Sequence, residues 1–286
     1  MLAAVAELKP LKASDYKTDV KPIWCPGCGD FGVLAALYQA LATKQLDPKD
    51  VVIVSGIGCS SRLPAFVKAY GFHSVHGRTL PVATGIKTAN PELTVLTVGG
   101  DGDAFAIGAG HIPHACRRNV DLTYIIMDNE IYGLTKGQAS PTSTLGLKKD
   151  STPYGTFEMP MNPIAMAIVY GASFVARGFS YRAKELQQTI VQAIEHPGFS
   201  FVQVMSPCPT FNDTEEEWKG EVAPMPANHD PSDKLGALKL SYDQERMYTG
   251  VYYKEIRPTL TERIVAVRDA ALAKPATMET LFDRYG

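Results

Sequence analysis

TVLTVGGDGD, residues 94–103, joins a short apolar run to a turn rich in glycine and aspartate. The run Thr94–Val98 is β-branched and apolar, which predicts a strand buried on both faces of a sheet. Ala104–Arg118 has helical spacing, so Gly100–Asp103 should lie in a strand-to-helix turn. In parallel α/β sheets, ligands bind at the carboxyl ends of the strands, and this turn falls at such an end.

Apolar runs and helical segments alternate on both sides of this turn. The further predicted strands are Val51–Ser55, Leu122–Met127, Ser173–Ala176 and Ser200–Met205. The further predicted helices are Phe31–Leu46, Ile164–Tyr170, Arg182–Glu195 and Thr261–Leu272. This alternation predicts a doubly wound, mainly parallel α/β sheet over residues 1–211. Phe211–Ser241 reads as irregular and is too long for an ordinary connection, so we expect residues 212–286 to form an irregular C-terminal extension that wraps a partner subunit.

The bulk composition excludes several classes of protein. A net charge of −2 over 286 residues argues against nucleic-acid binding, which needs a basic surface. The sequence contains no run of eighteen apolar residues, so a membrane span is not predicted. The N-terminus lacks the pattern of a secretory signal. We therefore expect a cytoplasmic protein. Its five cysteines, an odd number, favour metal or redox chemistry over a disulfide framework.

The glycine-rich turn has the chemistry of a diphosphate and magnesium site. Glycines let backbone N–H groups approach a diphosphate, and magnesium prefers hard oxygen ligands. Asp101 supplies a carboxylate, Asn129 an amide oxygen from the next strand end, and Ile131 a backbone carbonyl. A Gly-Asp-Gly alone is a weak signal, more typical of an ordinary tight turn between a strand and a helix. Residues 103–128 separate Gly102 from Asn129, which fits one helix plus one strand, and this spacing resembles the thiamine diphosphate signature.

Four cysteines lie where the sheet would bring them to one end. Cys25 and Cys28 precede a helix, whereas Cys59 and Cys208 each follow a predicted strand. Four thiolates suit zinc or an iron–sulfur cluster, and the spacing does not choose between them. Buried, unreactive cysteines are the structural alternative. Cys116 lies within a helical pattern and is interpreted as a packed, unliganded residue.

These motifs together resemble one family, the β subunits of 2-oxoacid:ferredoxin oxidoreductases. The resemblance runs from about residue 18 to residue 213. It rests on WCPGCG (24–29), GCS (58–60), HGR (76–78), ATG (83–85), the thiamine loop and YGLT (132–135). It implies that Cys25, Cys28, Cys59 and Cys208 hold a 4Fe–4S cluster, and that Asp101, Asn129 and the Ile131 carbonyl hold Mg²⁺. The positions it implies for contact with thiamine diphosphate are Ile57, Gly58, Cys59, Ser60, His76, Gly102, Asp103, Gly133 and Leu134.

The resemblance also implies an activity and its partners. A 2-oxoacid is decarboxylated on thiamine diphosphate, electrons leave through the cluster to ferredoxin, and coenzyme A takes the acyl group. An α subunit, or a fused γα subunit, carries the pyrimidine-binding domain and the acid that activates the thiamine ring, so this chain alone should be inactive. The direction of the reaction stays open. A non-redox thiamine decarboxylase or synthase, or a zinc-stabilised binding module, are the competing interpretations.

Two cations beside the cofactor loops are candidates for substrate binding. Arg62 follows the cysteine of GCS, and Lys136 follows the YGLT segment. Solvated surface cations are the simpler interpretation of both. If they bind substrate carboxylates or coenzyme A phosphates, a distal carboxylate would favour 2-oxoglutarate, with pyruvate next.

Overall fold

The fold is built on one eight-stranded sheet. The computed structural model describes residues 9–243, 245–273 and 277–285. The strands follow the order β2-β1-β3-β4-β8-β7-β10-β9. Neighbours from β2 to β7 run parallel, β10 pairs antiparallel with β7, and β9 pairs parallel with β10. The bounds are β1 Val51–Ser55, β2 Tyr70–His73, β3 Thr94–Gly100, β4 Leu122–Asp128, β7 Phe174–Phe179, β8 Phe199–Met205, β9 Val222–Pro224 and β10 Met247–Lys254. A separate hairpin pairs β5 Ile131–Tyr132 with β6 Gln138–Ala139.

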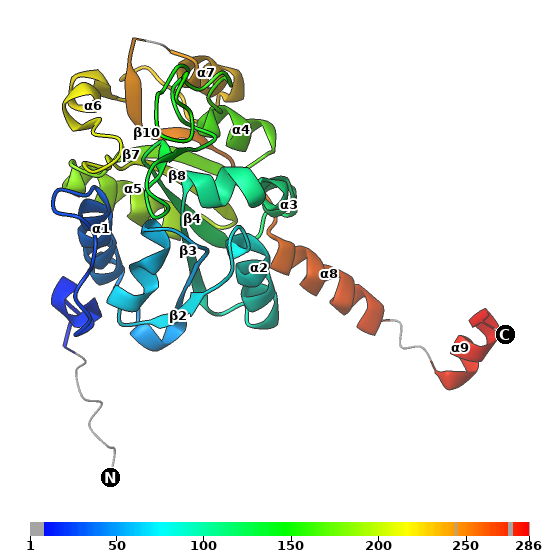
Figure 1. Ribbon diagram of the computed structural model, residues 1–286. Helices are drawn as coiled ribbons and strands as arrows, with labels where there is room; N and C mark the ends of the chain where they lie inside the picture. The colour runs from blue at the N-terminus through cyan, green and yellow to red at the C-terminus, as the bar shows by residue number, and fades with distance from the viewer. Residues whose placement is uncertain (1–8, 244, 274–276, 286) are drawn as a thin grey trace.

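Helices cover both faces of the sheet, as Figure 1 shows. On one face lie α1 Asp30–Thr43 and α5 Ala183–Glu195; on the other lie α2 Thr79–Ala89, α3 Ile112–Arg118 and α4 Pro163–Val169. Alternate residues of β1 enter the two cores, with Ile53 in the first and Val54 in the second. This explains why the strand is apolar throughout. The predicted doubly wound α/β class is confirmed.

Short 3-10 and π elements fill several connections. The 3-10 segments are Ala13–Tyr16, Pro48–Asp50, Ser60–Phe66 and Ala109–His111, and a π-helix spans Asp103–Ile107. The predicted helix Ala104–Arg118 is therefore broken, becoming regular only at α3. Gly108, Gly110 and Pro113 interrupt the pattern, and none of them favours a continuous α-helix. Such π segments are frequent at functional sites.

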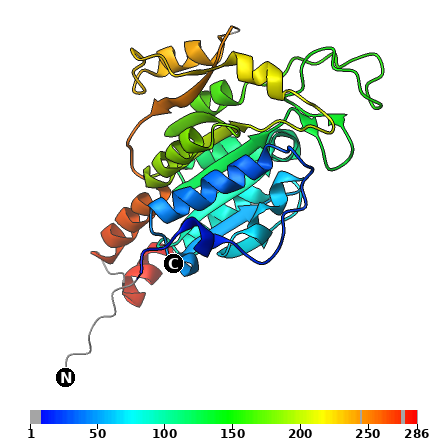
Figure 2. The same cartoon turned by 90° about the vertical axis from the view of Figure 1, so that its left-hand side faces the viewer.

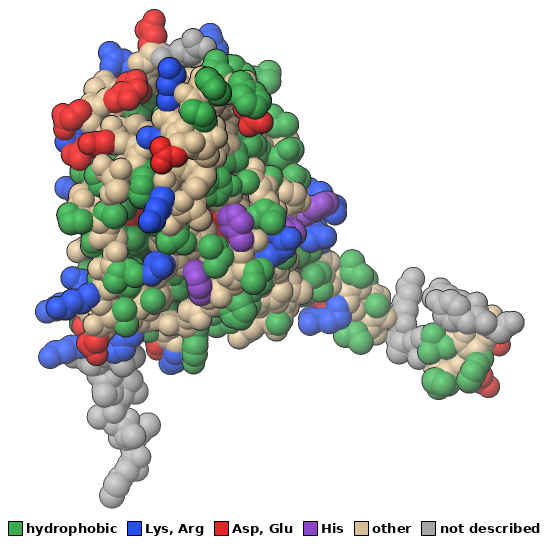
Figure 3. All heavy atoms as spheres, in the orientation of Figure 1, with side chains coloured by type: hydrophobic (Ala, Val, Ile, Leu, Met, Phe, Trp, Pro, Cys, Tyr) green, Lys and Arg blue, Asp and Glu red, His purple; other side chains and the backbone are tan. Residues whose placement is uncertain are grey.

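The C-terminal region is more regular than its sequence indicates. It contains α6 Glu215–Glu221, α7 Lys234–Ser241, α8 Leu260–Leu272 and α9 Met278–Tyr285, besides β9 and β10. Strand β10 extends the main sheet, whereas α8 and α9 stand away from the body in Figure 1. No residue of α8 is buried, and hydrophobic side chains are visible along this arm in Figure 3. None of the helices in the described ranges has the length and apolar character needed to cross a bilayer.

Candidate active site

The carboxyl ends of β1, β3 and β4 lie side by side in the sheet, and the loops that follow them enclose a cavity of about 540 Å³. Every residue predicted to bind magnesium or thiamine diphosphate lines this cavity. They are Ile57, Gly58, Cys59, Ser60, His76, Asp101, Gly102, Asp103, Asn129, Ile131, Gly133 and Leu134. Gly100, Tyr132, Thr135 and Gln138 complete the lining.

Asp101 offers a carboxylate oxygen at this cavity. The residue is 2% exposed, and its Oδ2 accepts a hydrogen bond of 2.9 Å from the Thr142 hydroxyl. Burial and the neighbouring Asp128 carboxylate raise the pKa of Asp101. A nearby cation would compensate this buried negative charge, so the residue fits a metal ligand.

The turn after β4 presents further oxygen atoms. Asn129 Oδ1 accepts a 3.1 Å hydrogen bond from the Ile131 N–H, which orders the turn. Glu130 between them adopts a φ of 55°, a left-handed conformation that is uncommon outside glycine. Burial, then Asp128 and Asp101, raise the pKa of Glu130 to about 8. A carboxylate, an amide oxygen and a backbone carbonyl are the hard ligands that Mg²⁺ takes, so this set fits the ion.

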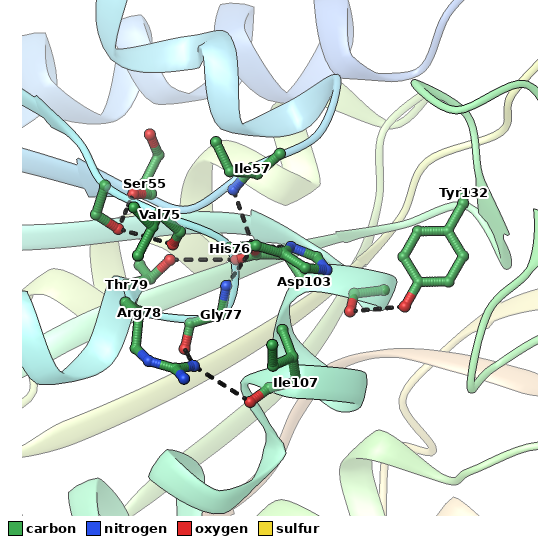
Figure 4. Close-up of polar contacts among 12 residues, drawn as sticks. Ser55, Ile57, Val75, His76, Gly77, Arg78, Thr79, Asp103, Ile107 and Tyr132 are labelled. Atoms are coloured by element: carbon green, nitrogen blue, oxygen red, sulfur yellow. Dashed lines mark hydrogen bonds and ion pairs between the residues drawn. The ribbon is translucent and has the colours of Figure 1, made fainter.

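Asp103 fastens two of the cavity loops to the sheet (Figure 4). Its buried Oδ1 accepts hydrogen bonds from the Ile57 N–H at 2.9 Å and the Gly77 N–H at 2.8 Å, and lies 2.8 Å from His76 Nδ1. A Cβ at Gly56 would overlap the Asp103 carboxylate, which is why glycine is needed there. The carboxylate is thus engaged by the protein, and its role in the structure is to hold the loops.

Tyr132 packs directly on the glycine-rich turn. Its hydroxyl donates a 3.2 Å hydrogen bond to the Gly102 carbonyl. A Cβ at Gly102 would overlap the ring of Tyr132, so glycine is required for this close approach. Tyr132 belongs to the YGLT motif but was not among the predicted site residues. Its position between Ile131 and Gly133, both predicted site residues, was the signal that could have identified it.

The four predicted cluster cysteines line a second cavity of about 150 Å³. All four are free thiols. The indole N–H of Trp24 donates a 2.7 Å hydrogen bond to the Cys59 carbonyl, which ties the first motif to the second. This cavity adjoins the larger one, because Cys59, Asn129, Gly133 and Leu134 line both.

The four thiols differ in exposure: Cys25 is exposed, Cys28 and Cys59 are partly buried, and Cys208 is buried. Burial, with smaller contributions from Asp30 and Cys208, raises the pKa of Cys59 to about 11, and burial likewise raises the pKa of Cys28. In the described part of the chain, no group of three or more His, Cys, Asp or Glu side chains has the geometry to hold a single metal ion. A single tetrahedral zinc needs sulfurs about 2.3 Å from one centre. The four thiols line one cavity, and four thiolates are also the ligand set of a 4Fe–4S cluster.

The remaining candidates lie at different places. Arg62 lines the cysteine cavity with an exposed side chain. Lys136 is exposed on the β5–β6 turn, with a φ of 76°, and is absent from the lining of both cavities. Cys116 is fully buried in the core formed with α3, as its helical pattern predicts.

Comparison with known proteins gives this geometry its context. Residues 56–204 match the thiamine pyrophosphate enzyme, C-terminal TPP binding domain, and residues 208–269 match the C-terminal family of the pyruvate ferredoxin oxidoreductase beta subunit. The chain is 45% identical over 277 residues to the 2-oxoacid:ferredoxin oxidoreductase subunit beta of Saccharolobus solfataricus, covering 90% of each chain. It is 41% identical over 248 residues to the 2-oxoglutarate synthase subunit KorB of Archaeoglobus fulgidus, covering 86% of each.

A solved structure agrees with these sequence matches. The 2-oxoglutarate:ferredoxin oxidoreductase from Magnetococcus marinus, with 2-oxoglutarate, coenzyme A and succinyl-CoA bound, superposes with a TM-score of 0.92. The identity is 42%, and the match covers 98% of both chains. The thiamine-binding domain, the matching C-terminal region and the shared fold lead to one assignment: this chain belongs to the β subunits of the 2-oxoacid:ferredoxin oxidoreductases.

Proposed function

We propose that the chain takes part in coenzyme A-dependent oxidative decarboxylation of 2-oxoglutarate, with pyruvate as the next substrate, and passes electrons to ferredoxin. The observation that carries this proposal is the wall shared by the two cavities. One cavity has the donor set for a magnesium diphosphate and the other has four thiols, and Cys59 lines both. A redox centre is thereby brought next to the place of decarboxylation.

Each cavity receives its own cofactor in this proposal. Asp101, Asn129 and the Ile131 carbonyl hold Mg²⁺, and the residues of the larger cavity contact thiamine diphosphate. When bound, that cofactor supplies the electron sink that decarboxylation requires. The four thiols hold a 4Fe–4S cluster, a choice supported by the cavity that they share and by the ferredoxin oxidoreductase relatives. The chain's own part is to orient both groups and to separate them by a thin wall.

The choice of 2-oxoglutarate rests on the relatives and on two cations. The Archaeoglobus relative is a 2-oxoglutarate synthase subunit, and the Magnetococcus enzyme holds 2-oxoglutarate and coenzyme A. Arg62 lines the cysteine cavity and can meet a carboxylate or phosphate there. Lys136 is exposed and follows Thr135, which lines the larger cavity. The predicted cytoplasmic location stays a prediction.

Exposed apolar surface supports assembly with an α subunit. Tyr154 is 96% exposed, Phe157 87% and Met159 77%, all on the loop between β6 and α4. Figure 2 shows this green loop standing out from the body. Large exposed apolar groups on one loop mark an interaction site. We propose that this loop and the region 212–286 contact the partner, which supplies the rest of the thiamine site.

Anaerobic purification of the complex with metal and cofactor analysis tests the proposal. We expect iron, acid-labile sulfide and thiamine diphosphate, with the broad visible absorption of an iron–sulfur cluster. Thiamine diphosphate without iron would instead indicate a non-redox thiamine enzyme. Zinc without thiamine would indicate a binding module. Turnover by the isolated chain would contradict the need for a partner.

A further inference from the structure

Behind the larger cavity, a line of hydrogen-bonded side chains runs from strand β7 to Asp101. The Arg177 Nε donates to Gln203 Oε1 at 2.9 Å, and Gln203 Nε2 donates to Asp128 Oδ2 at 2.8 Å. The Thr142 hydroxyl, which has one proton to donate, lies 2.9 Å from both Asp128 Oδ1 and Asp101 Oδ2. Four side chains thus lead from strand β7 to the proposed metal ligand, Asp101.

The donors and acceptors around Gln203 fix the orientation of its side-chain amide. Arginine only donates hydrogen bonds, so the oxygen of the Gln203 amide must face Arg177 and its NH₂ must face Asp128. Arg177 is itself held, because its Nη1 donates at 2.9 Å to the hydroxyl of Tyr252 on β10. A flipped amide would set its NH₂ against the Arg177 donor and its oxygen against the Asp128 carboxylate, which is costly in a buried place. The Asp128 carboxylate therefore has one favoured orientation.

Thr142 is well placed to transmit that orientation. Its side chain is 4% exposed, and it comes from the loop after β6, not from the sheet. Ser143, which follows it, accepts a 2.8 Å hydrogen bond from the Ser140 N–H and donates to the Glu130 carbonyl. This short segment is therefore fastened to the turn that carries Asn129. One hydroxyl then separates two carboxylates that would otherwise repel each other.

We propose that Thr142 and Gln203 are positioning residues that set how tightly the chain binds its divalent cation, acting through the Asp101 carboxylate. This inference rests on the proposed function of Asp101 as a magnesium ligand. Removing a hydrogen-bond partner of a metal ligand typically weakens metal binding about 10–100-fold. Neither residue lines the larger cavity, so neither contacts the cofactor directly.

Mn²⁺ binding by the purified complex measures the effect. The metal is removed with a chelator, Mn²⁺ is titrated back with thiamine diphosphate present, and free Mn²⁺ is followed by electron paramagnetic resonance. Thr142→Val should weaken Mn²⁺ binding about 10–100-fold, while Thr142→Ser, which keeps the hydroxyl, should stay within about threefold of the wild type. Thr97→Val is the matched control. Thr97 is buried on β3 and its hydroxyl donates at 3.0 Å to the Thr123 carbonyl, away from the metal ligands.

A double variant separates positioning from general damage. Gln203→Met keeps the side-chain length and should weaken Mn²⁺ binding through Thr142, so Thr142→Val with Gln203→Met should lose no more affinity than Thr142→Val alone. Losses that multiply would overturn the inference, as would wild-type affinity in Thr142→Val or an equal loss in Thr97→Val. If the wild-type complex itself binds no Mn²⁺, the proposed function fails first and this inference fails with it.

Discussion

Replacing Asp103 by alanine should loosen both loops that it fastens beside the larger cavity. Its buried carboxylate accepts hydrogen bonds from the Ile57 and Gly77 backbone N–H groups, and it also lies 3.3 Å from the Thr79 hydroxyl. In the alanine variant both backbone groups would lose their acceptor. In Asp103→Asn an amide oxygen can still accept from both, although the charge is lost.

The magnitude follows from the unsatisfied groups. Each buried donor left without an acceptor costs about 1–3 kcal/mol, so the two amides together cost about 4 kcal/mol in Asp103→Ala. Loss of the charge alone in Asp103→Asn should cost about 1–2 kcal/mol. With a Tm change of about 2–4 °C per kcal/mol, Asp103→Ala should melt about 8–16 °C below the wild type.

Differential scanning fluorimetry of the purified complex measures the decrease in Tm. Titration with thiamine diphosphate measures whether the loosened loops weaken cofactor binding. The alanine variant should also bind thiamine diphosphate more weakly, since Ile57 and His76 line the cavity. Asp230→Ala is the control: that carboxylate, at the surface, also accepts a backbone hydrogen bond, from the Ser232 N–H at 2.8 Å. Melting of Asp103→Ala within about 2 °C of the wild type, or an asparagine variant as unstable as the alanine one, would refute the reasoning.

Three further changes test other parts of the molecule. Cys208→Ser should lower iron content per chain, whereas Cys116→Ala, in the core, should leave it unchanged, as a colorimetric iron assay would show. Burial lowers the pKa of His196 to about 4, below its unfolded value of about 6.5, so the neutral side chain contributes stability that is present above pH 6.5 and lost as the pH falls toward 4. Between pH 6.5 and 5 this amounts to about 2 kcal/mol, and His196→Gln should remove that part of the Tm decrease; an unchanged pH slope would contradict it. Tyr154→Ser with Phe157→Ser should weaken recovery of the α subunit in a pull-down, and full recovery would exclude that loop from the interface.

Elements that are buried in the fold could be predicted from the sequence, because burial requires a recognisable run of apolar residues. Strand β1 was predicted with its observed bounds, because both of its faces are covered and every residue is apolar or small. Strand β2 is an exposed edge and has no apolar run to mark it. Glu215–Glu217 forms the first turn of α6, where acidic side chains stabilise the helix N-terminus. The buried Trp218 that holds this helix to the body could be assigned only from tertiary contacts.

Some residues of the candidate site could likewise be predicted from the sequence, and others could not. Asp101, Asn129 and the cysteines could be selected because carboxylate, amide and thiol groups at strand ends are typical ligands of metals and clusters. Thr142 could not, since its role depends on a loop that folds back between the ends of β3 and β4. Its hydroxyl-rich segment, ASPTST at 139–144, was visible in the sequence, but such a segment is equally common in surface loops.

Gly133 lies in the wall between the two cavities, close to two of the cysteine sulfurs. A Cβ at this position would lie 3.7 Å from the sulfurs of both Cys59 and Cys208, and 3.9 Å from Asn129 Nδ2. Because residue 133 is glycine, only backbone stands there between the thiols and the amide that faces the metal turn. A longer side chain would have to project between the sulfurs or into the cofactor cavity. Gly133 therefore keeps its own part of the shared wall thin, beside Cys59, Asn129 and Leu134, which also line both cavities.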